Sequence, residues 1–493
     1  MNTVAKKSKA LFAFFAGFFV LAIAVSAFLD QYLFIVIPFA TILFYAGWEN
    51  RNTIFFLLLL TLPLSFEYNF SSTLGTDIPD EFLMLLTSCL FLAYWLFSPG
   101  VVSKKMRCHP LLLLLYAAFV WQMIAVLFST NLLVSTKFLL AKTWYISAFV
   151  LAPLLVFSTK KSIKIAAQLV AGSMLFIAAT ALIRHANSGL SFATINDAVA
   201  PFFRNHVNYS AMLVCMVPVL FACRKLAERG NLKWVLGVVI VIALVALFFS
   251  YARGAWLALM IGILSYWLIK KKLLVVAYIS FIIVTIAAVF WLKSNDRYLH
   301  YAHDYQTTIF HKEFKEHLIA TYKLRDVSTA ERFYRWIAGV RMIKDSWLTG
   351  YGPNTFYDNY KPYAVPAFKT WVSNNKEHST VHNYFLLTVI EQGVPGLLLF
   401  IILLGGMLYY AQKLYHRVQD IFYRTTAITI GIILTMLIVV NFLSDLIETD
   451  KIGSLFFLCL SLLIIIDINA GSGTSIVQTD ERSDPSTDVQ CIS

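Results

Sequence analysis

The sequence predicts an all-α polytopic membrane protein with about 12–14 transmembrane helices. Of its 493 residues, 59% are hydrophobic and only 14% are charged, whereas soluble domains carry about 25% charged residues. Continuous apolar runs, such as residues 11–29, are long enough to cross a bilayer as helices. A transmembrane β-barrel would instead show alternating segments of about 10 residues. These observations exclude a soluble enzyme, a disordered chain and a fibrous one.

The apolar runs predict the order of the membrane spans. We expect spans near residues 11–29, 31–47, 53–66, 81–98, 110–128, 140–158, 164–183, 206–222, 233–250, 255–269, 272–292, 383–410, 424–443 and 452–468. The third run is short for a full crossing, which leaves 12 or 13 spans as alternatives to 14. The first run has a basic flank like a signal peptide, but the second follows almost at once, so we interpret it as an uncleaved helix.

These runs divide the chain into four parts. Residues 1–292 form an N-terminal transmembrane bundle of about 11 spans, and residues 293–382 form one large outer loop. Residues 383–468 add about three further spans, and residues 469–493 are expected to be a disordered cytoplasmic tail. An outer loop of this length and aromatic content predicts a small folded element containing helices.

The charge pattern predicts which way the protein faces. About half of the 40 Lys and Arg residues cluster in every second short loop, as the positive-inside rule predicts for cytoplasmic turns. The net charge of +13 therefore indicates topology and contact with anionic lipid, and we expect no nucleic-acid partner. The outward loops are then residues 67–80, 129–139, 184–204, 250–253, 293–382 and 441–451. The six cysteines form neither a disulfide framework nor a CxxC metal pair.

One helix of the large loop can be placed from its local pattern. Ser328 and Glu331 have capping-box spacing, and the pattern ends at Gly350. Arg332 and Arg335 lie off the apolar stripe, and each alone is expected at the surface. The stripe predicted to pack on protein or lipid is Phe333, Trp336, Ile337, Val340, Ile343 and Trp347.

Charged residues at the outer ends of spans are the candidates for function, because such groups are costly there. An outward arginine suits a lipid phosphate, since a guanidinium grips phosphate oxygens with paired donors. For Arg253 we favour phosphate binding over the two alternatives, a structural ion pair and a side chain that snorkels to the membrane surface. For Arg204 a loop arginine without function is an equal alternative.

His382 is the candidate base because it begins a helix, whose positive dipole end favours a neutral imidazole. The alternative is a histidine that caps the helix or lies at the membrane interface. His378 and His382 are four residues apart, a spacing that can ligate zinc, but no third ligand is evident and we predict no metal.

The combination resembles the lipopolysaccharide O-antigen ligase and O-antigen polymerase superfamily of bacterial membrane glycan transferases. The resemblance covers roughly residues 200–410 and is most specific from Gly350 to Gly396. It is carried by Phe203-Arg204-Asn205-His206, Tyr251-Ala252-Arg253-Gly254, Glu331-Arg332, Gly350-Tyr351-Gly352-Pro353, and His382-Asn383 followed by Glu391-Gln392-Gly393. This chain departs from the simplest ligases in having about 14 spans instead of 12.

The resemblance implies a GT-C-like helical fold and a metal-independent, inverting glycosyltransferase without cofactors. The donor would be an undecaprenyl-diphosphate-linked glycan and the acceptor a hydroxyl of lipid A-core or of a growing polysaccharide, at the periplasmic side of the bacterial inner membrane. His382 would act as base, and Arg204 and Arg253 would hold the diphosphate. The further candidates for binding substrate are His206, Arg332, Arg335, His378, Asn383 and Glu391.

Several functions remain open at this level. Within the superfamily, a ligase, a polymerase and a protein O-oligosaccharyltransferase differ only in their acceptor. A transporter or flippase of lipid-linked glycans would also use many spans, but transporters place ionisable residues near the bilayer midplane. Here they gather at the outer rim, which favours surface chemistry. A structural scaffold would need none of them.

Overall fold

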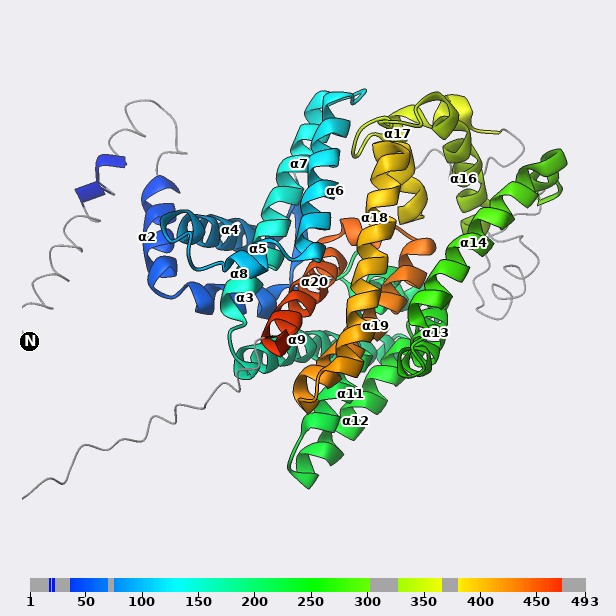
Figure 1. Cartoon of the computed structure of the whole chain (residues 1–493). Coiled ribbons are helices and arrows are strands. Elements are labelled where there is room, and N and C mark those ends of the chain that lie inside the picture. The colour runs from blue at the N-terminus through cyan, green and yellow to red at the C-terminus, as the bar shows by residue number, and fades with distance from the viewer. Residues whose placement is uncertain are drawn as a thin grey trace, which may run out of the picture.

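A computed structural model describes residues 17–18, 20–22, 36–69, 75–301, 327–365 and 380–471. The described chain is helical apart from one short hairpin (Figure 1). Its main elements are α2 (Val36–Glu49), α3 (Arg51–Thr61), β1 (Phe66–Asn69), β2 (Gly75–Ile78), α4 (Asp80–Phe97), α5 (Lys104–Arg107), α6 (Pro110–Leu127), α7 (Leu132–Ile146), the π-helical turn η2 (Ser147–Leu151), α8 (Ala152–Val156), α9 (Lys160–Asn187), α10 (Ile195–Val199), α11 (His206–Leu226), α12 (Gly230–Phe248), α13 (Arg253–Lys270), α14 (Leu274–Lys293), α16 (Val327–Asp345), α17 (Phe356–Asn359), α18 (Tyr384–Arg417), α19 (Ile421–Phe442) and α20 (Asp450–Gly471).

The all-α polytopic architecture is confirmed. Within the described ranges, ten helices are long and apolar enough to cross a membrane. The run expected at 140–158 is part of a longer segment, Leu132–Val156, in which α7 continues through η2 into α8. The run expected at 53–66 forms only the short helix α3, and the antiparallel hairpin β1–β2 follows it. Most of the first expected span lies outside the described residues.

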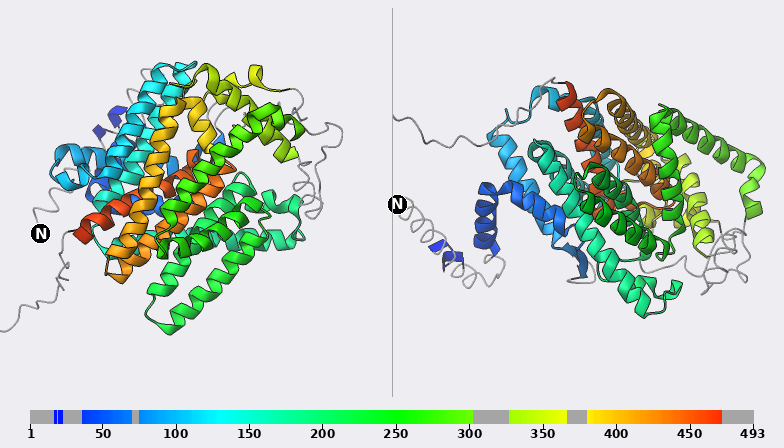
Figure 2. Two further views of the ribbon diagram at one scale, coloured as in Figure 1. Left: turned by 45° about the vertical axis from the view of Figure 1, so that its right-hand side comes forward. Right: turned by 90° about the horizontal axis from the view of Figure 1, so that it is seen from below.

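Three helices form the centre of the bundle. In α20, α19 and α11, 78%, 72% and 61% of the apolar window is buried, against 22% in α12 and 11% in α14. The central helices therefore pack on protein, while α12 and α14 present their side chains outward, where lipid would solvate them. The right-hand view of Figure 2 shows α14 at the edge of the molecule. Close helix contact uses small residues, since Gly262 of α13 lies against Met436 of α19.

The predicted inward loops meet at one end of the bundle, which we call the basic end. There Lys160 pairs with Asp420 at 2.5 Å, and Arg417 pairs with Asp467 at 3.1 Å. Asp420 also caps α19 through the backbone N–H groups of Phe422 and Tyr423. Burial alone would raise the pKa of Asp420, but Lys160 and these N–H groups hold it below its usual range. The described residues of the predicted outward loops meet at the opposite end, which we call the site end. There Lys451 donates to the Phe202 carbonyl, and Tyr251 donates to the Leu190 carbonyl.

The helix expected in the large loop is α16, but its buried face differs from the prediction. Tyr334, Ala338 and Met342 are buried, whereas Trp347 is exposed. The predicted stripe, from Phe333 to Trp347, flanks this face. The helix already includes Val327, one residue before the expected cap at Ser328. The Glu331 carboxylate accepts a hydrogen bond from Arg335.

The expectation of a surface position is also wrong for Arg335, whose side chain is fully buried. The Glu331–Arg335 ion pair, 2.9 Å between Oε1 and Nε, explains this. An i,i+4 partner on the same helix face neutralises the guanidinium where it leaves water.

Candidate active site

The connection between α19 and α20, residues 442–451, is where the outer ends of several helices meet. We call it the α19–α20 turn. Leu443 lies against Gly254 at the start of α13, and the Ser444 carbonyl accepts a hydrogen bond from the N–H of Tyr384 at the start of α18. The Asn441 side chain braces the turn by accepting the Ile447 N–H at 2.8 Å. The turn thus links the helices that begin next to Arg253 and His382.

His382 faces this turn. Its Nδ1 lies 3.8 Å from Oδ1 of Asp445, and the Thr380 hydroxyl donates a hydrogen bond to the other Asp445 oxygen. The imidazole is 34% exposed, so part of the ring is open to a substrate. Asn383, not His382, caps α18, because its side chain accepts the Leu386 N–H at 3.0 Å. The capping alternative for His382 is therefore excluded.

The backbone before His382 is held by α16. The guanidinium of Arg335 donates to the Thr380 carbonyl at 2.7 Å, and the Trp336 indole N–H donates to the Val381 carbonyl at 3.0 Å. His382 itself has a φ of +54°, a left-handed conformation that costs free energy in a residue other than glycine. These two hydrogen bonds hold the backbone of the two residues directly before His382. Arg335 and Trp336 therefore position the histidine.

Asp445 is the charged partner of this histidine. Burial alone would raise the pKa of Asp445, but contact with His382 and Thr380 outweighs burial and holds that pKa below its usual range. Asp445 is therefore an anion at neutral pH. An anion beside Nδ1 favours the tautomer with its proton on Nδ1, which leaves Nε2 as the proton acceptor.

Arg253 is the first residue of α13 and is half-buried. It follows a tight turn in which Tyr251 has a φ of +56°. The Tyr251 hydroxyl donates to the Leu190 carbonyl at 2.5 Å, and its ring meets His185 and Phe192 edge-on. The outer loop of residues 188–205, which carries Arg204 near its end, is thereby attached to the backbone that leads into Arg253.

Arg204 and His206 lie at the start of α11. Arg204 is exposed, and Phe203 before it packs under the ammonium group of Lys451 at 4.2 Å. The N–H and Nδ1 of His206 both lie within hydrogen-bond distance of the Asn196 side-chain oxygen, at 3.0 and 2.9 Å. His206 therefore secures the loop that carries Arg204.

Glu391 has a structural position in the break of α18. The helix is interrupted at Gly393, where φ is +70°, and the peptide N–H groups of Tyr351 and Gly352 donate to the Ile390 and Glu391 carbonyls. The buried Glu391 side chain accepts the Phe356 N–H at 3.2 Å. A side chain at Gly393 would collide with the Leu348 carbonyl, so the glycine permits this close approach.

Residues 238–401 match the family model Wzy_C, described as O-antigen ligase. Over that segment the match supports the resemblance to the O-antigen ligase and polymerase superfamily. No curated protein matches the chain. The O-antigen ligase match covers Arg253, α16 and His382, and it ends before Asp445.

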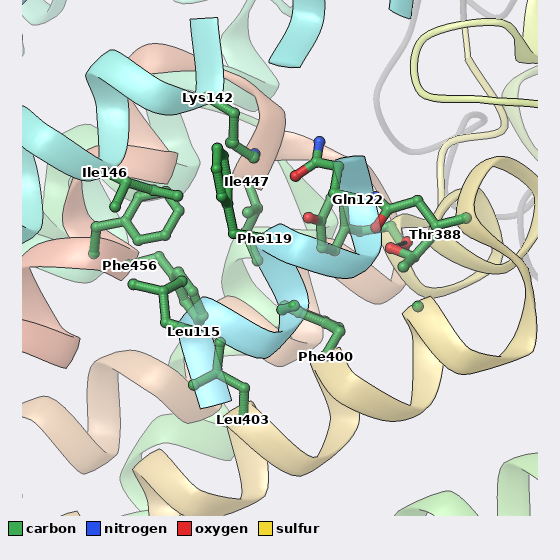
Figure 3. A pocket seen from close by; sticks show the side chains of 15 residues that line it. Leu115, Phe119, Gln122, Lys142, Ile146, Thr388, Phe400, Leu403, Ile447 and Phe456 are labelled. Atoms are coloured by element: carbon green, nitrogen blue, oxygen red, sulfur yellow. Dashed lines mark hydrogen bonds between the residues drawn. The ribbon is translucent and has the colours of Figure 1, made fainter. Parts of the chain in front are cut away.

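A cavity of about 60 Å³ lies beside the α19–α20 turn. Figure 3 shows the polar lining residues Lys142 on α7 and Gln122 on α6. It also shows Phe400 of α18, which belongs to the apolar part of the lining. Lys142 pairs with Glu448 of the turn at 3.2 Å. The Gln122 amide nitrogen is buried without a hydrogen-bond partner. This mixed lining suits a small polar group carried on an apolar chain.

The structure brings His382 and the start of α13 to one turn. Arg332 lies half-buried on α16, and His378 lies outside the described residues. Asn383, Glu391 and Arg335 make the structural contacts given above. The sequence analysis missed Asp445 and Thr380. The available signal for Asp445 was an acidic residue in a short outward loop between two apolar spans.

Proposed function

We propose that the protein transfers a glycan from an undecaprenyl-diphosphate lipid to an acceptor hydroxyl at the periplasmic face of the bacterial inner membrane. The observation that supports this proposal is the contact between His382 and Asp445 of the α19–α20 turn. The same turn contacts Gly254, the residue after Arg253. A base and a fixed cation are the two groups that this reaction requires from the protein.

His382 is the proposed base. Its Nε2 takes the proton of the acceptor hydroxyl while the acceptor oxygen forms a bond to the anomeric carbon of the donor sugar. The bond from that carbon to the diphosphate oxygen breaks, and the diphosphate leaves with the electron pair. Attack from the side opposite the leaving group inverts the anomeric centre. Asp445 stabilises the imidazolium that forms.

Arg253 and Arg204 are the proposed diphosphate ligands. Diphosphate already leaves readily, so the protein needs only to stabilise the charge that develops on it. Guanidinium groups do this with paired donors and stay protonated. The chemistry requires no metal ion or other cofactor at the reacting atoms. Arg335 and Asn383 act on the substrate only through the position that they give His382.

The acceptor defines the type of enzyme. Transfer to lipid A-core makes the protein a ligase, transfer to another lipid-linked glycan makes it a polymerase, and transfer to a Ser or Thr hydroxyl makes it a protein O-oligosaccharyltransferase. Analysis of cellular glycans after deletion of the gene separates the first two. Loss of all attached glycan indicates a ligase, whereas a ladder reduced to one repeat indicates a polymerase.

Reconstitution tests the proposal as a whole. Purified protein in detergent, with donor lipid and acceptor, is expected to form product without a membrane gradient, which a flippase or other transporter would not do. Arg253→Ala and His382→Ala are expected to abolish transfer at unchanged membrane abundance. Wild-type activity in both variants would refute the assigned roles.

A further inference from the structure

A cluster of three carboxylates at the site end lies outside the proposed active site. Asp77 is on β2, Asp80 begins α4 and Asp450 begins α20. One carboxylate oxygen from each lies within 4.8 Å of the others. The cluster thus joins the hairpin, an N-terminal helix and the central helix α20, three elements distant in sequence.

Asp80 is the deepest member, and its carboxylate is the one observation that points to a ligand. Its side chain is fully buried, and neither oxygen has a hydrogen-bond partner. The nearby Ser65 hydroxyl donates instead to the Leu62 carbonyl at 3.0 Å. Buried carboxylates are normally paired or bound to a metal, because burial removes their hydration.

The other charged groups near the cluster already have hydrogen-bond partners elsewhere. The Lys451 ammonium donates to the carbonyl oxygens of Pro63, Ser65 and Phe202, so it offsets one negative charge while it holds the backbone. The Glu81 carboxylate accepts hydrogen bonds from Thr76 and from the Asp77 N–H. With all three aspartates ionised, the cluster and Lys451 together carry a formal charge of −2, which a divalent cation neutralises.

We propose that Asp77, Asp80 and Asp450 bind a divalent cation, with Ca²⁺ preferred. Carboxylate oxygens are the ligands of hard cations, and Ca²⁺ binds them at about 2.3–2.6 Å. Two oxygens on opposite sides of Ca²⁺ are therefore about 4.6–5.2 Å apart, a span that accommodates the observed spread. Mg²⁺ requires a near-ideal octahedron and gives up its water ligands reluctantly, so carboxylates from three separate elements favour Ca²⁺.

The bound cation has a structural role in this proposal. It fastens β2 and α4 to α20, and through Lys451 it steadies the backbone at Phe202, two residues before Arg204. Its ligands include neither His382 nor Asp445, so it takes no part in the transfer chemistry. The cation site therefore stands or fails independently of the proposed function.

Thermal unfolding of the purified full-length protein in detergent tests the site. After treatment with EDTA and its removal, CaCl₂ is expected to raise Tm by several degrees, MgCl₂ by less, and NaCl of equal ionic strength by none. Asp80→Asn is expected to abolish the Ca²⁺ response. Asp197→Asn, an exposed aspartate on α10 at the same end, is the matched control and is expected to retain it.

A second variant covers the case in which Asp80→Asn does not fold. Asp77 is only half-buried, so Asp77→Asn is expected to fold and to weaken Ca²⁺ binding at least tenfold in a calorimetric titration. A Ca²⁺ response that persists unchanged in these variants, or no response beyond that to NaCl, overturns the proposal. A protein that gains stability on acidification and ignores Ca²⁺ holds protons at the cluster, which also overturns it.

Discussion

Replacing Asp445 with asparagine removes one charge from the histidine pair and leaves the packing nearly intact. The asparagine oxygen can still accept the hydrogen bond that the Thr380 hydroxyl donates to Asp445. The amide nitrogen, however, is a hydrogen-bond donor and cannot accept a hydrogen bond from Nδ1 of His382. The substitution therefore lowers the share of the tautomer with a free Nε2, and it removes the anion that stabilises the imidazolium.

The expected magnitude follows from the contact distance. Two unit charges 3.8 Å apart interact by about 4 kcal/mol at an effective dielectric constant of about 20. His382 is 34% exposed, so solvent screens part of this interaction. We therefore take about 1.5–3 kcal/mol, roughly one third to two thirds of the unscreened value. This corresponds to a decrease in kcat of about tenfold to more than a hundredfold.

The assay is glycan transfer by purified protein at saturating donor and acceptor, with KM measured for both. Asp445→Asn is expected to lower kcat and to leave the donor KM nearly unchanged, because Asp445 does not touch the proposed diphosphate site. Asp358→Asn, at an exposed position on α17, controls for the loss of a surface charge. A wild-type kcat in Asp445→Asn would show that this carboxylate does not orient the base.

Three further predictions concern other parts of the structure. Arg253→Lys is expected to keep the fold but to raise the donor KM at least tenfold, since a point charge replaces a paired grip; donor titrations would contradict this if lysine bound donor as well as arginine. Gly393→Ala places a methyl group 2.0 Å from a carbonyl oxygen at a φ of +70°, and it should lower the free energy of unfolding by about 2–5 kcal/mol. The control Gly172→Ala, with no atom within 4 Å of the added methyl group, should change that free energy by no more than about 1 kcal/mol in thermal unfolding. The lowered pKa of Asp445 means that its carboxylate stabilises the fold above the unfolded pKa of about 4. The Tm difference between wild type and Asp445→Asn should therefore shrink as pH falls below about 4, and a difference independent of pH would oppose this.

Periodicity and charge were sufficient to predict most of the long helices and the basic end of the bundle. The inward loops carry clustered lysines and arginines, and the structure brings Lys160 of one such loop to Asp420 of another. Each signal is local, because an apolar run or a basic cluster can be recognised without knowledge of its partners. Arg253 and His382 were found in the same way, as ionisable residues at the outer ends of apolar runs.

The pairing of side chains between elements could not be predicted. Asp445 is one acidic residue in a short loop, and only the packing of α18 against the α19–α20 turn brings it to His382. The buried face of α16 was misplaced because Arg335 was treated as a surface cation. Its burial depends on Glu331 on the same helix and on the Thr380 carbonyl of a distant segment. Asn383 and Glu391 were assigned to substrate, yet they satisfy backbone N–H groups at helix and loop starts.

The most direct test of the proposed active site is a structure of the His382→Ala variant with bound donor lipid. This variant is expected to bind donor but not to turn it over. The account predicts diphosphate density in contact with Arg253 and Arg204, with the first sugar facing the α19–α20 turn beside residue 382. Diphosphate bound at the basic end, or at the site end without contact to either arginine, would contradict the account.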